Sequence, residues 1–210
     1  IGAMENFGKT VGFVTTRLIG FKIASAAVTG LGGAFSSAVG DAIEFETNLV
    51  KVAQVSDRSV KSLHTLSAAV SRLSTTYGAA SSDLIKVSKT LSQAGLSIRE
   101  VEQALGGLAK TTLLPTFGDI NETAEASIAI MAQFGVEAQD LEKTLFAVDA
   151  VTGKLAVEAT DVTVAVKKMG GIFAQLSPDT QSATDTFNQF LATFASVRAT
   201  TRESAQNIAV

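Results

Sequence analysis

The sequence predicts an all-helical chain, and three observations support this prediction. The 210 residues include only two prolines and no run of alternating polar and apolar residues, so strands are not expected. Apolar side chains recur at spacings of three and four residues along most of the chain. Glycines interrupt this periodicity, and residues that can cap a new helix follow closely. We therefore predict an irregular bundle of short helices with glycine-terminated, Ser/Thr/Asp-capped segments, preceded by a longer helix rich in small residues.

The N-terminal segment differs from the rest in its small side chains. Residues 23–40 are uncharged and rich in Ala, Gly, Ser and Thr. Their length is at the lower limit for a membrane-spanning helix, whereas their small residues suit close packing of one helix on another. Packing in an assembly is the favoured interpretation, and membrane insertion is the alternative. Gly8-Lys9-Thr10 resembles the end of a phosphate-binding loop, but Gly2 lies at the wrong spacing, so nucleotide binding is not expected.

The stretch from Phe45 to Tyr77 is expected to contain the end of the N-terminal helix and then a second helix. Asp57 is a reasonable cap between them, and Gly78 ends the second because glycine adopts the left-handed conformation without a steric penalty. The apolar positions of the two helices are Leu49, Val52 and Val55, and then Val60, Leu63, Leu66, Val70 and Leu73.

The signals that end one helix and start the next are clearest around residue 95. Ser81 or Ser82 can cap a helix that Gly95 ends at a C′ position with positive φ. Ser97 and Glu100 then form a Ser-x-x-Glu capping box, so the next helix begins at once. The apolar face of the first of these helices consists of Leu84, Val87 and Leu91.

Similar signals continue to the C-terminus. The residues 115–118 form a turn, since proline disfavours helix at the residue before it, and Thr200 with Glu203 predicts a last capping box. The glycines at intervals of about 17 to 23 residues share no side-chain pattern beyond helical periodicity, so a repeat protein is not predicted. Further expected stops are Gly118, Gly135, Gly153 and Gly170 or Gly171, and the expected starts are Asp119 with Glu122, Glu137 and Asp140, Glu158–Asp161, and Ser177-Pro178.

Composition argues against several kinds of chemistry. A net charge of −3 gives no clustered positive charge for nucleic acid. The chain has no cysteine, and its only histidine, His64, lies off the apolar stripe, where it is a surface or boundary residue rather than a base. Carboxylates gather at helix starts, where they complement the helix dipole. We expect no catalytic, cofactor-binding or metal-binding residues, no cofactor and no enzymatic activity.

The predicted domain organisation has three parts. Residues 1–44 form a small-residue-rich helical leader that contacts an assembly or a membrane. Residues 45–205 form a compact helical body with apolar stripes on every helix, and residues 206–210 begin a continuation.

A series of short motifs in this order resembles the core region of phage tail tape measure proteins. The similarity covers roughly Phe45 to Ala205 and rests on order and spacing together. Its motifs are Phe45-Glu46, Tyr77-Gly78-Ala79, Ala94-Gly95-Leu96-Ser97, Phe134-Gly135-Val136, Asp149-Ala150-Val151, Lys167-Lys168-Met169-Gly170 and Thr200-Thr201-Arg202-Glu203-Ser204-Ala205. Such proteins are usually far longer, so the resemblance implies a folded portion of one.

The resemblance implies a structural role in a bacteriophage or prophage tail. The family sets tail length, occupies the tube lumen or tip, and is ejected during genome delivery. The implied partners are tail tube subunits, tail-tip or baseplate proteins, tail assembly chaperones and further copies in a trimer or hexamer, often through coiled coils. The implied locations are the virion tail, the host cytoplasm during assembly and the host envelope after ejection, with host membrane contact at that stage and no sequence-specific nucleic acid binding. The alternative is a membrane-active helical module, a pore-former or translocator acting through residues 23–40.

Overall fold

The computed structural model describes residues 31–155, 157–176, 181–201 and 205–208. The chain divides into two units, Ile1–Gly40 and Asp41–Val210. This division lies inside helix α2 (Leu31–Val55), slightly before the predicted start of the compact body at Phe45. Most of the predicted leader, residues 1–30, lies outside the described residues.

The prediction of an all-helical bundle of short helices is confirmed, and the described residues contain no strand. After α2, the elements are η1 (Val60–Leu63), α3 (His64–Tyr77), α4 (Ser81–Gln93), α5 (Ile98–Thr111), α6 (Ile120–Phe134), η2 (Ala138–Asp140), α7 (Leu141–Leu155), α8 (Ala159–Leu176), α9 (Ala183–Thr201) and α10 (Ala205–Ile208).

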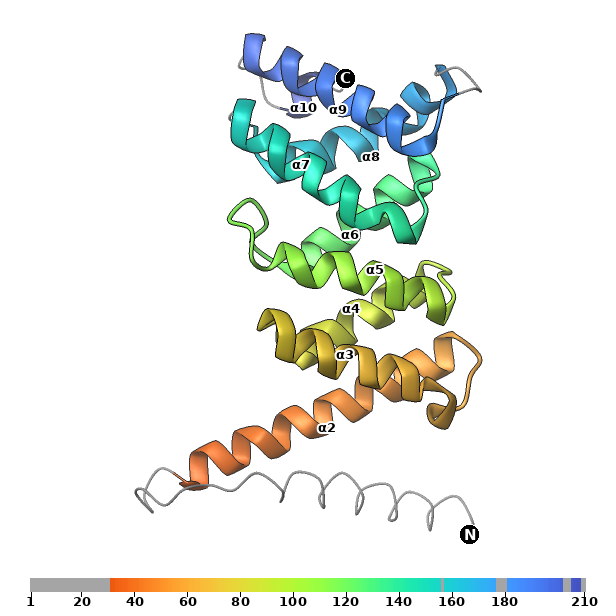
Figure 1. Ribbon diagram of the computed structural model, residues 1–210, viewed down its shortest axis with the longest axis vertical. Coiled ribbons are helices and arrows are strands. Elements are labelled where there is room, and N and C mark those ends of the chain that lie inside the picture. The colour runs from red at the N-terminus through yellow and green to blue at the C-terminus, as the bar shows by residue number, and fades with distance from the viewer. Residues whose placement is uncertain (1–30, 156, 177–180, 202–204, 209–210) are drawn as a thin grey trace. The chain divides into compact units, whose positions relative to one another are not determined.

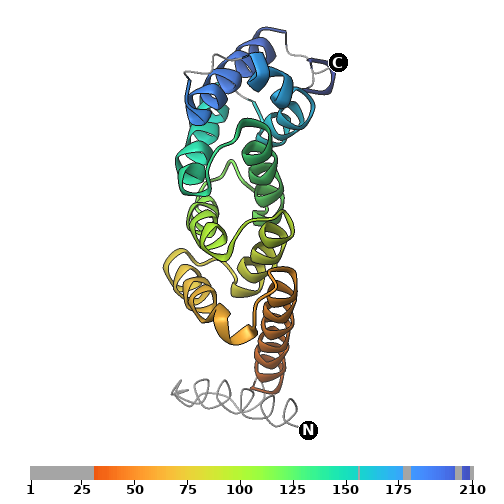
Figure 2. The same ribbon diagram turned by 90° about the vertical axis from the view of Figure 1, so that its right-hand side faces the viewer.

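Within the second unit, the helices stack in two layers (Figure 1). The most extensive contacts join helices that are two apart in the chain: α4 with α6, α6 with α8, α5 with α7, and α7 with α9. Figure 2 shows the result as two columns, with α3, α5, α7 and α9 in one and α4, α6 and α8 in the other. Consecutive helices therefore form hairpins, and each hairpin packs on the next.

This order makes the bundle more regular than predicted. Gly95 and Gly135 occupy equivalent turns of successive hairpins at an interval of 40 residues, and Leu105 and Leu145 are buried at the same interval. The repeating unit is thus a pair of helices, whereas the glycine intervals of about 17 to 23 residues correspond to single helices. A repeat of two helices is the usual unit of stacked helical proteins.

Three of the predicted glycine stops are confirmed. Gly78, Gly95 and Gly135 follow helices with φ of 75°, 94° and 73°. At Gly95, the backbone N–H of Leu96 donates to Leu91 O at 3.2 Å and that of Gly95 donates to Ser92 O at 3.0 Å. These two bonds define a Schellman motif, with glycine at its left-handed position.

Two predicted helix starts are also confirmed. Ser97 caps α5, with its backbone N–H donating to Glu100 Oε2 at 2.7 Å and its hydroxyl accepting from the Glu100 N–H at 3.4 Å. Asp119 caps α6, because its carboxylate accepts from the Asn121 N–H at 2.6 Å. Both caps satisfy backbone donors that the first helical turn leaves free.

Two predicted caps are wrong. Ser81 and Ser82 lie inside α4, whose N-cap is Ala80 without a side-chain hydrogen bond, because the chain turns into the helix directly after buried Ala79. Asp57 ends α2 instead of starting a helix. Asp57 has a φ of 50°. Its backbone N–H donates to Gln54 O, and the N–H of Arg58 donates to Ala53 O, so α2 ends in the same Schellman motif as the helix before Gly95.

Several predicted stops are not stops. Gly153 and the Gly170-Gly171 pair lie inside α7 and α8, while Gly118 lies in the loop between Thr111 and Ile120 without positive φ. The glycine at 170 is explained by packing: a Cβ there would lie 2.8 Å from Phe134 Cε2 on α6. Tertiary contact, rather than helix termination, requires this glycine.

The predicted capping box at Thr200 is also wrong. Thr200 lies near the end of α9, where its hydroxyl donates to Ser196 O at 2.8 Å, so the helix that was expected to start there is the end of an earlier one. Its proposed partner Glu203, like Ser177 and Pro178, lies outside the described residues.

The second unit has two apolar clusters. The aliphatic cluster, formed largely by α2 to α5 and the start of α7, includes Leu66, Val70, Leu84, Leu91, Leu105, Leu108 and Leu141. The phenylalanine cluster, formed by α6 to α9, includes Phe134, Val148, Val162, Val166, Phe187, Phe190, Leu191 and Phe194. Phe117, in the turn after α5, packs against both.

Candidate functional site

Two hollows lie between the loops of successive hairpins. The first, about 460 Å³, is lined by the loop from Pro115 to Asp119, the end of α7 and the start of α8. The second, about 560 Å³, is lined by residues around the turns at Gly95 and Gly135, with side chains from α5 and η2. Each hollow is therefore a consequence of stacking one hairpin on the next.

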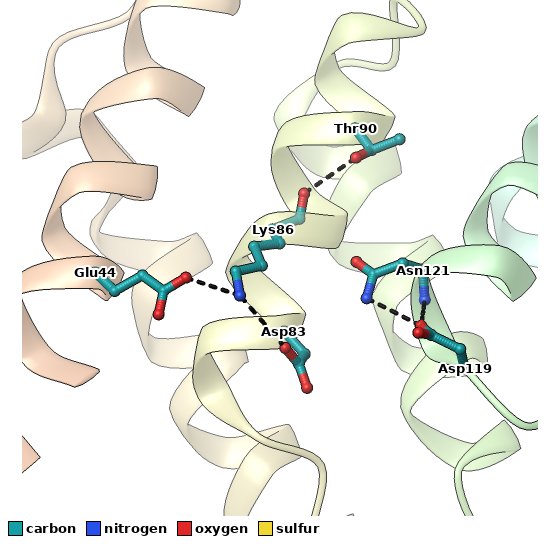
Figure 3. Close-up of polar contacts among 6 residues, drawn as sticks. All are labelled: Glu44, Asp83, Lys86, Thr90, Asp119 and Asn121. Atoms are coloured by element: carbon teal, nitrogen blue, oxygen red, sulfur yellow. Dashed lines mark hydrogen bonds and ion pairs between the residues drawn. The ribbon is translucent and has the colours of Figure 1, made fainter. Parts of the chain in front are cut away.

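Several polar groups of the first hollow are engaged in local structure. The Asp119 carboxylate accepts from the backbone N–H of Asn121 and, at 3.0 Å, from its side-chain amide (Figure 3). Both bonds hold the pKa of Asp119 below its usual value, and the bond from the Asn121 backbone N–H has the larger effect. Thr116 donates its hydroxyl to Asp149 on α7, which fixes the loop to the next hairpin. A carboxylate held ionised in a cap is unsuited to exchange protons near neutral pH.

The second hollow has the capping box at its edge. The Ser97 hydroxyl donates to Glu100 Oε2 at 2.6 Å, and the Ser97 backbone N–H donates to the same oxygen. Both hydrogen bonds lower the pKa of Glu100, and the bond from the Ser97 hydroxyl has the larger effect. Glu100 is thus a hydrogen-bond acceptor that starts α5.

Ion pairs link helices across the stack. Lys86 on α4 lies 2.7 Å from Glu44 on α2 and 3.8 Å from Asp83 (Figure 3), and the hydrogen bond to Glu44 is the main cause that raises the pKa of Lys86. Lys110 on α5 lies 2.5 Å from Glu142 on α7, which likewise raises the pKa of Lys110.

Two further ion pairs also join different helices. Lys167 on α8 lies 3.8 Å from Glu125 on α6, and Arg198 on α9 lies 3.3 Å from Asp161 on α8. Among the described residues, three of the four interhelical ion pairs thus join alternate helices, in the direction of the stack. Exposed pairs of this kind contribute little stability each, and they favour one register of the hairpins over another.

The residues considered for chemistry are not brought together. His64 is exposed at the first position of α3, as predicted, and is remote in sequence from both hollows. In the part of the chain that the structure describes, no group of three or more His, Asp or Glu side chains could hold a metal ion. Gly8-Lys9-Thr10 lies outside the described residues.

The membrane interpretation falls mostly outside the described residues. Of residues 23–40, only 31–40 are described, as the start of α2. No helix among the described residues combines the length and apolar character that crossing a bilayer requires.

Exposed apolar side chains are the remaining candidate for function. Ile43 on α2 and the pair Ile172 and Leu176 on α8 are 60%, 65% and 81% exposed. Ile43 lies outside the predicted apolar stripe of Leu49, Val52 and Val55, of which Leu49 and Val52 pack in the aliphatic cluster. A second set of apolar positions on the opposite side of α2, at heptad spacing, was the available signal.

The chain was also compared with known proteins. It matches no protein-family model, no curated protein and no solved structure.

Proposed function

We propose that this chain is a folded portion of a phage tail tape measure protein and acts as a structural component of a long-tailed phage or prophage. In this role it is part of a protein that sets tail length, resides in the tail lumen or tip, and leaves with the genome. Its partners are tail tube subunits, tail-tip proteins and tail assembly chaperones. It acts by binding, without catalysis.

The observation that carries this proposal is the ordered series of motifs shared with that family. Three of these motifs, around Gly78, Gly95 and Gly135, lie at left-handed helix ends. A fourth contains Gly170, where an added Cβ would lie 2.8 Å from Phe134 Cε2 on α6. A fifth contains Asp149, which accepts the Thr116 hydroxyl. Five of the seven motifs thus lie at helix ends or at contacts between elements, as expected for a likeness in architecture rather than in a reaction site.

The compact stack of hairpins does not suit the part of such a protein that measures tail length. A ruler needs a long uninterrupted helix that extends by about 1.5 Å per residue. The described helices of the second unit are short and fold back on one another in hairpins. We therefore assign this region to a compact body that is attached to a rod and binds other tail proteins.

The proposal can be tested on tails of the phage or prophage that encodes the chain. Peptides from residues 41–208 should be found by mass spectrometry in gradient-purified tails, and an antibody to this region should co-precipitate the tail tube subunit from assembling cells. An in-frame deletion of the α6–α7 hairpin should block tail assembly or leave tail length unchanged. A ruler would shorten by about 1.5 Å per deleted residue.

Two results would contradict the proposal. The first is absence of the chain from purified tails that contain the other tail proteins. The second is leakage of liposomes caused by the isolated full chain, together with no tail partner, which would favour the membrane-active alternative through residues 23–40.

A further inference from the structure

The two hollows between the hairpins differ in the charge of their walls. Among the described residues, no lysine, arginine or histidine lines the first hollow. Its charged residues are Asp119, Glu122 and Glu158. The second hollow contains Arg99 beside Glu100 and Glu137, so its charges are mixed. The first hollow therefore has negative charge without a cation of its own, and Lys154, next to its lining residue Gly153, is exposed to solvent.

The threonine side chains of the first hollow have already used their donors. A hydroxyl group has one hydrogen to donate and two lone pairs to accept with. Each threonine hydroxyl of the wall donates to a carboxylate or to a backbone oxygen of the same chain. These residues are Thr116, Thr123, Thr152, Thr160 and Thr163. Since the other polar side chains of the wall are the three carboxylates, its side chains offer a ligand acceptors only, and the ligand must supply the donors.

The rest of the wall is largely apolar, and exposed leucines adjoin it. The apolar lining residues include Pro115, Phe117, Ala126, Val157 and Ala159. Leu113 lies two residues before Pro115 and is 63% exposed, and Leu155 lies two residues before Val157 and is 37% exposed. Exposed apolar side chains that adjoin a hollow are typical of a surface that binds a partner. The volume of about 460 Å³ is also within the usual range for sites that enclose a ligand group.

We propose that the first hollow binds a basic peptide segment of a partner protein, with a lysine or arginine side chain inside it and apolar neighbours of that residue on Leu113 and Leu155. The alkyl part of such a side chain suits the apolar wall, and its head group carries only donors and a positive charge. Charge complementarity thus favours this occupant over an acidic segment. The inference stands on the hollow and does not depend on the role in a tail.

Fluorescence anisotropy of the full chain with a synthetic peptide tests the proposal. The probe is Gly-Leu-Ala-Lys-Ala-Leu-Gly amide with a neutral dye at its N-terminus, and two matched peptides carry glutamine or glutamate in place of lysine. The lysine peptide should bind with a Kd below about 1 mM and about tenfold more tightly than either matched peptide. Added salt should weaken this binding, because the carboxylates are exposed.

Variants of the chain locate the site. The double variant Glu122→Gln/Glu158→Gln leaves the Asp119 cap in place and should weaken binding of the lysine peptide by about tenfold. Glu137→Gln in the second hollow is the matched control and should leave the affinity unchanged. Circular dichroism of each variant shows whether its helices are intact.

A second pair of variants tests the apolar contacts without touching the helix starts. Leu113→Ser should weaken binding several-fold, whereas Ile172→Ser, at a 65% exposed position twelve residues beyond Thr160 on α8, should not. Both side chains are largely exposed, so these variants keep the proposal testable if the double variant loses helical structure.

Three results would overturn the proposal. The first is no binding of the lysine peptide at about 1 mM, and the second is equal weakening by Glu137→Gln and the double variant. The third is tighter binding of the glutamate peptide, which would show that the N-termini of α6 and α8 attract an anion instead. Spermidine, a free polyamine, should not displace the peptide at equal concentration. Displacement would assign the hollow to small cations and would also overturn the proposal.

Discussion

The aliphatic and phenylalanine clusters belong to one stack of hairpins, yet their helices are placed by different means. In the aliphatic half, α2, α3 and α4 end at Asp57, Gly78 and Gly95, all with positive φ. In the phenylalanine half, Gly135 is the last described residue with positive φ, and the later glycines lie inside helices. Local backbone signals therefore dominate the first half and side-chain contacts dominate the second.

The phenylalanine cluster depends on ring contacts. Phe190 lies at its centre, with ring centroids 5.1 Å from Phe134, 5.4 Å from Phe173 and 6.3 Å from Phe187 and Phe194. These rings come from α6, α8 and α9, so a single side chain holds three helices of both layers together. Aromatic pairs at these distances contribute beyond the area that they bury.

The largest effect is expected from Phe190→Ala, which should lower the free energy of unfolding by about 3–5 kcal/mol through lost burial and a cavity. Phe146→Ala is the matched control, because Phe146 is 40% exposed on α7, and it should cost much less. Urea unfolding followed by circular dichroism gives both values. Equal losses for the two variants would contradict the central position of Phe190.

A smaller effect is expected where helices approach closely. Gly170→Ala should lower the free energy of unfolding by about 1–3 kcal/mol, because the new Cβ would meet the Phe134 ring at 2.8 Å. Gly106→Ala on α5 meets nothing within 4 Å and should stabilise the helix by about 0.5–1 kcal/mol. Opposite signs in thermal unfolding are the expected result, and a stabilising Gly170→Ala would remove the close-contact explanation.

Substitutions at two residues with positive φ in the aliphatic half, Gly95 and Asp57, should have opposite effects on stability. Gly95→Val should lower the free energy of unfolding by about 1–2 kcal/mol, since a β-branched residue is strained at φ of 94°. Asp57→Gly should raise it by up to about 1 kcal/mol, because aspartate already bears part of this strain at φ of 50°. Unchanged melting of Gly95→Val would show that the turn can form with another geometry.

The smallest effect is expected at the capping box. Ser97→Ala should lower the free energy of unfolding by about 0.5–2 kcal/mol, and a double-mutant cycle with Glu100→Gln should show coupling. Because the pKa of Glu100 is lowered in the folded state, its contribution is present above the unfolded pKa, about 4.3, and is lost as pH falls through the folded pKa. Coupling that is the same at pH 7 and pH 2.5 would contradict the ionised box.

The contrast between the two halves explains which predictions from the sequence succeeded. The Ser97 box and the Gly95 stop depend on hydrogen bonds between residues at most five apart, so the sequence contains all the information that they need. Asp57 uses the same local motif, but aspartate is also a common N-cap, so the sequence predicts a helix start where a helix ends. The apolar face of α4 was equally local, and Leu84, Val87 and Leu91 are buried.

The sequence by itself determined that this protein is helical, where most helices of the aliphatic half end, and which faces are apolar, because these properties follow from periodicity and neighbouring backbone groups. Only the tertiary structure decided that hairpins stack in two layers and that Gly170 lies inside a helix against Phe134. It also decided that Ile43 and Val50 on α2 stay exposed. These properties depend on side chains far apart in the chain, whose contact no local pattern specifies.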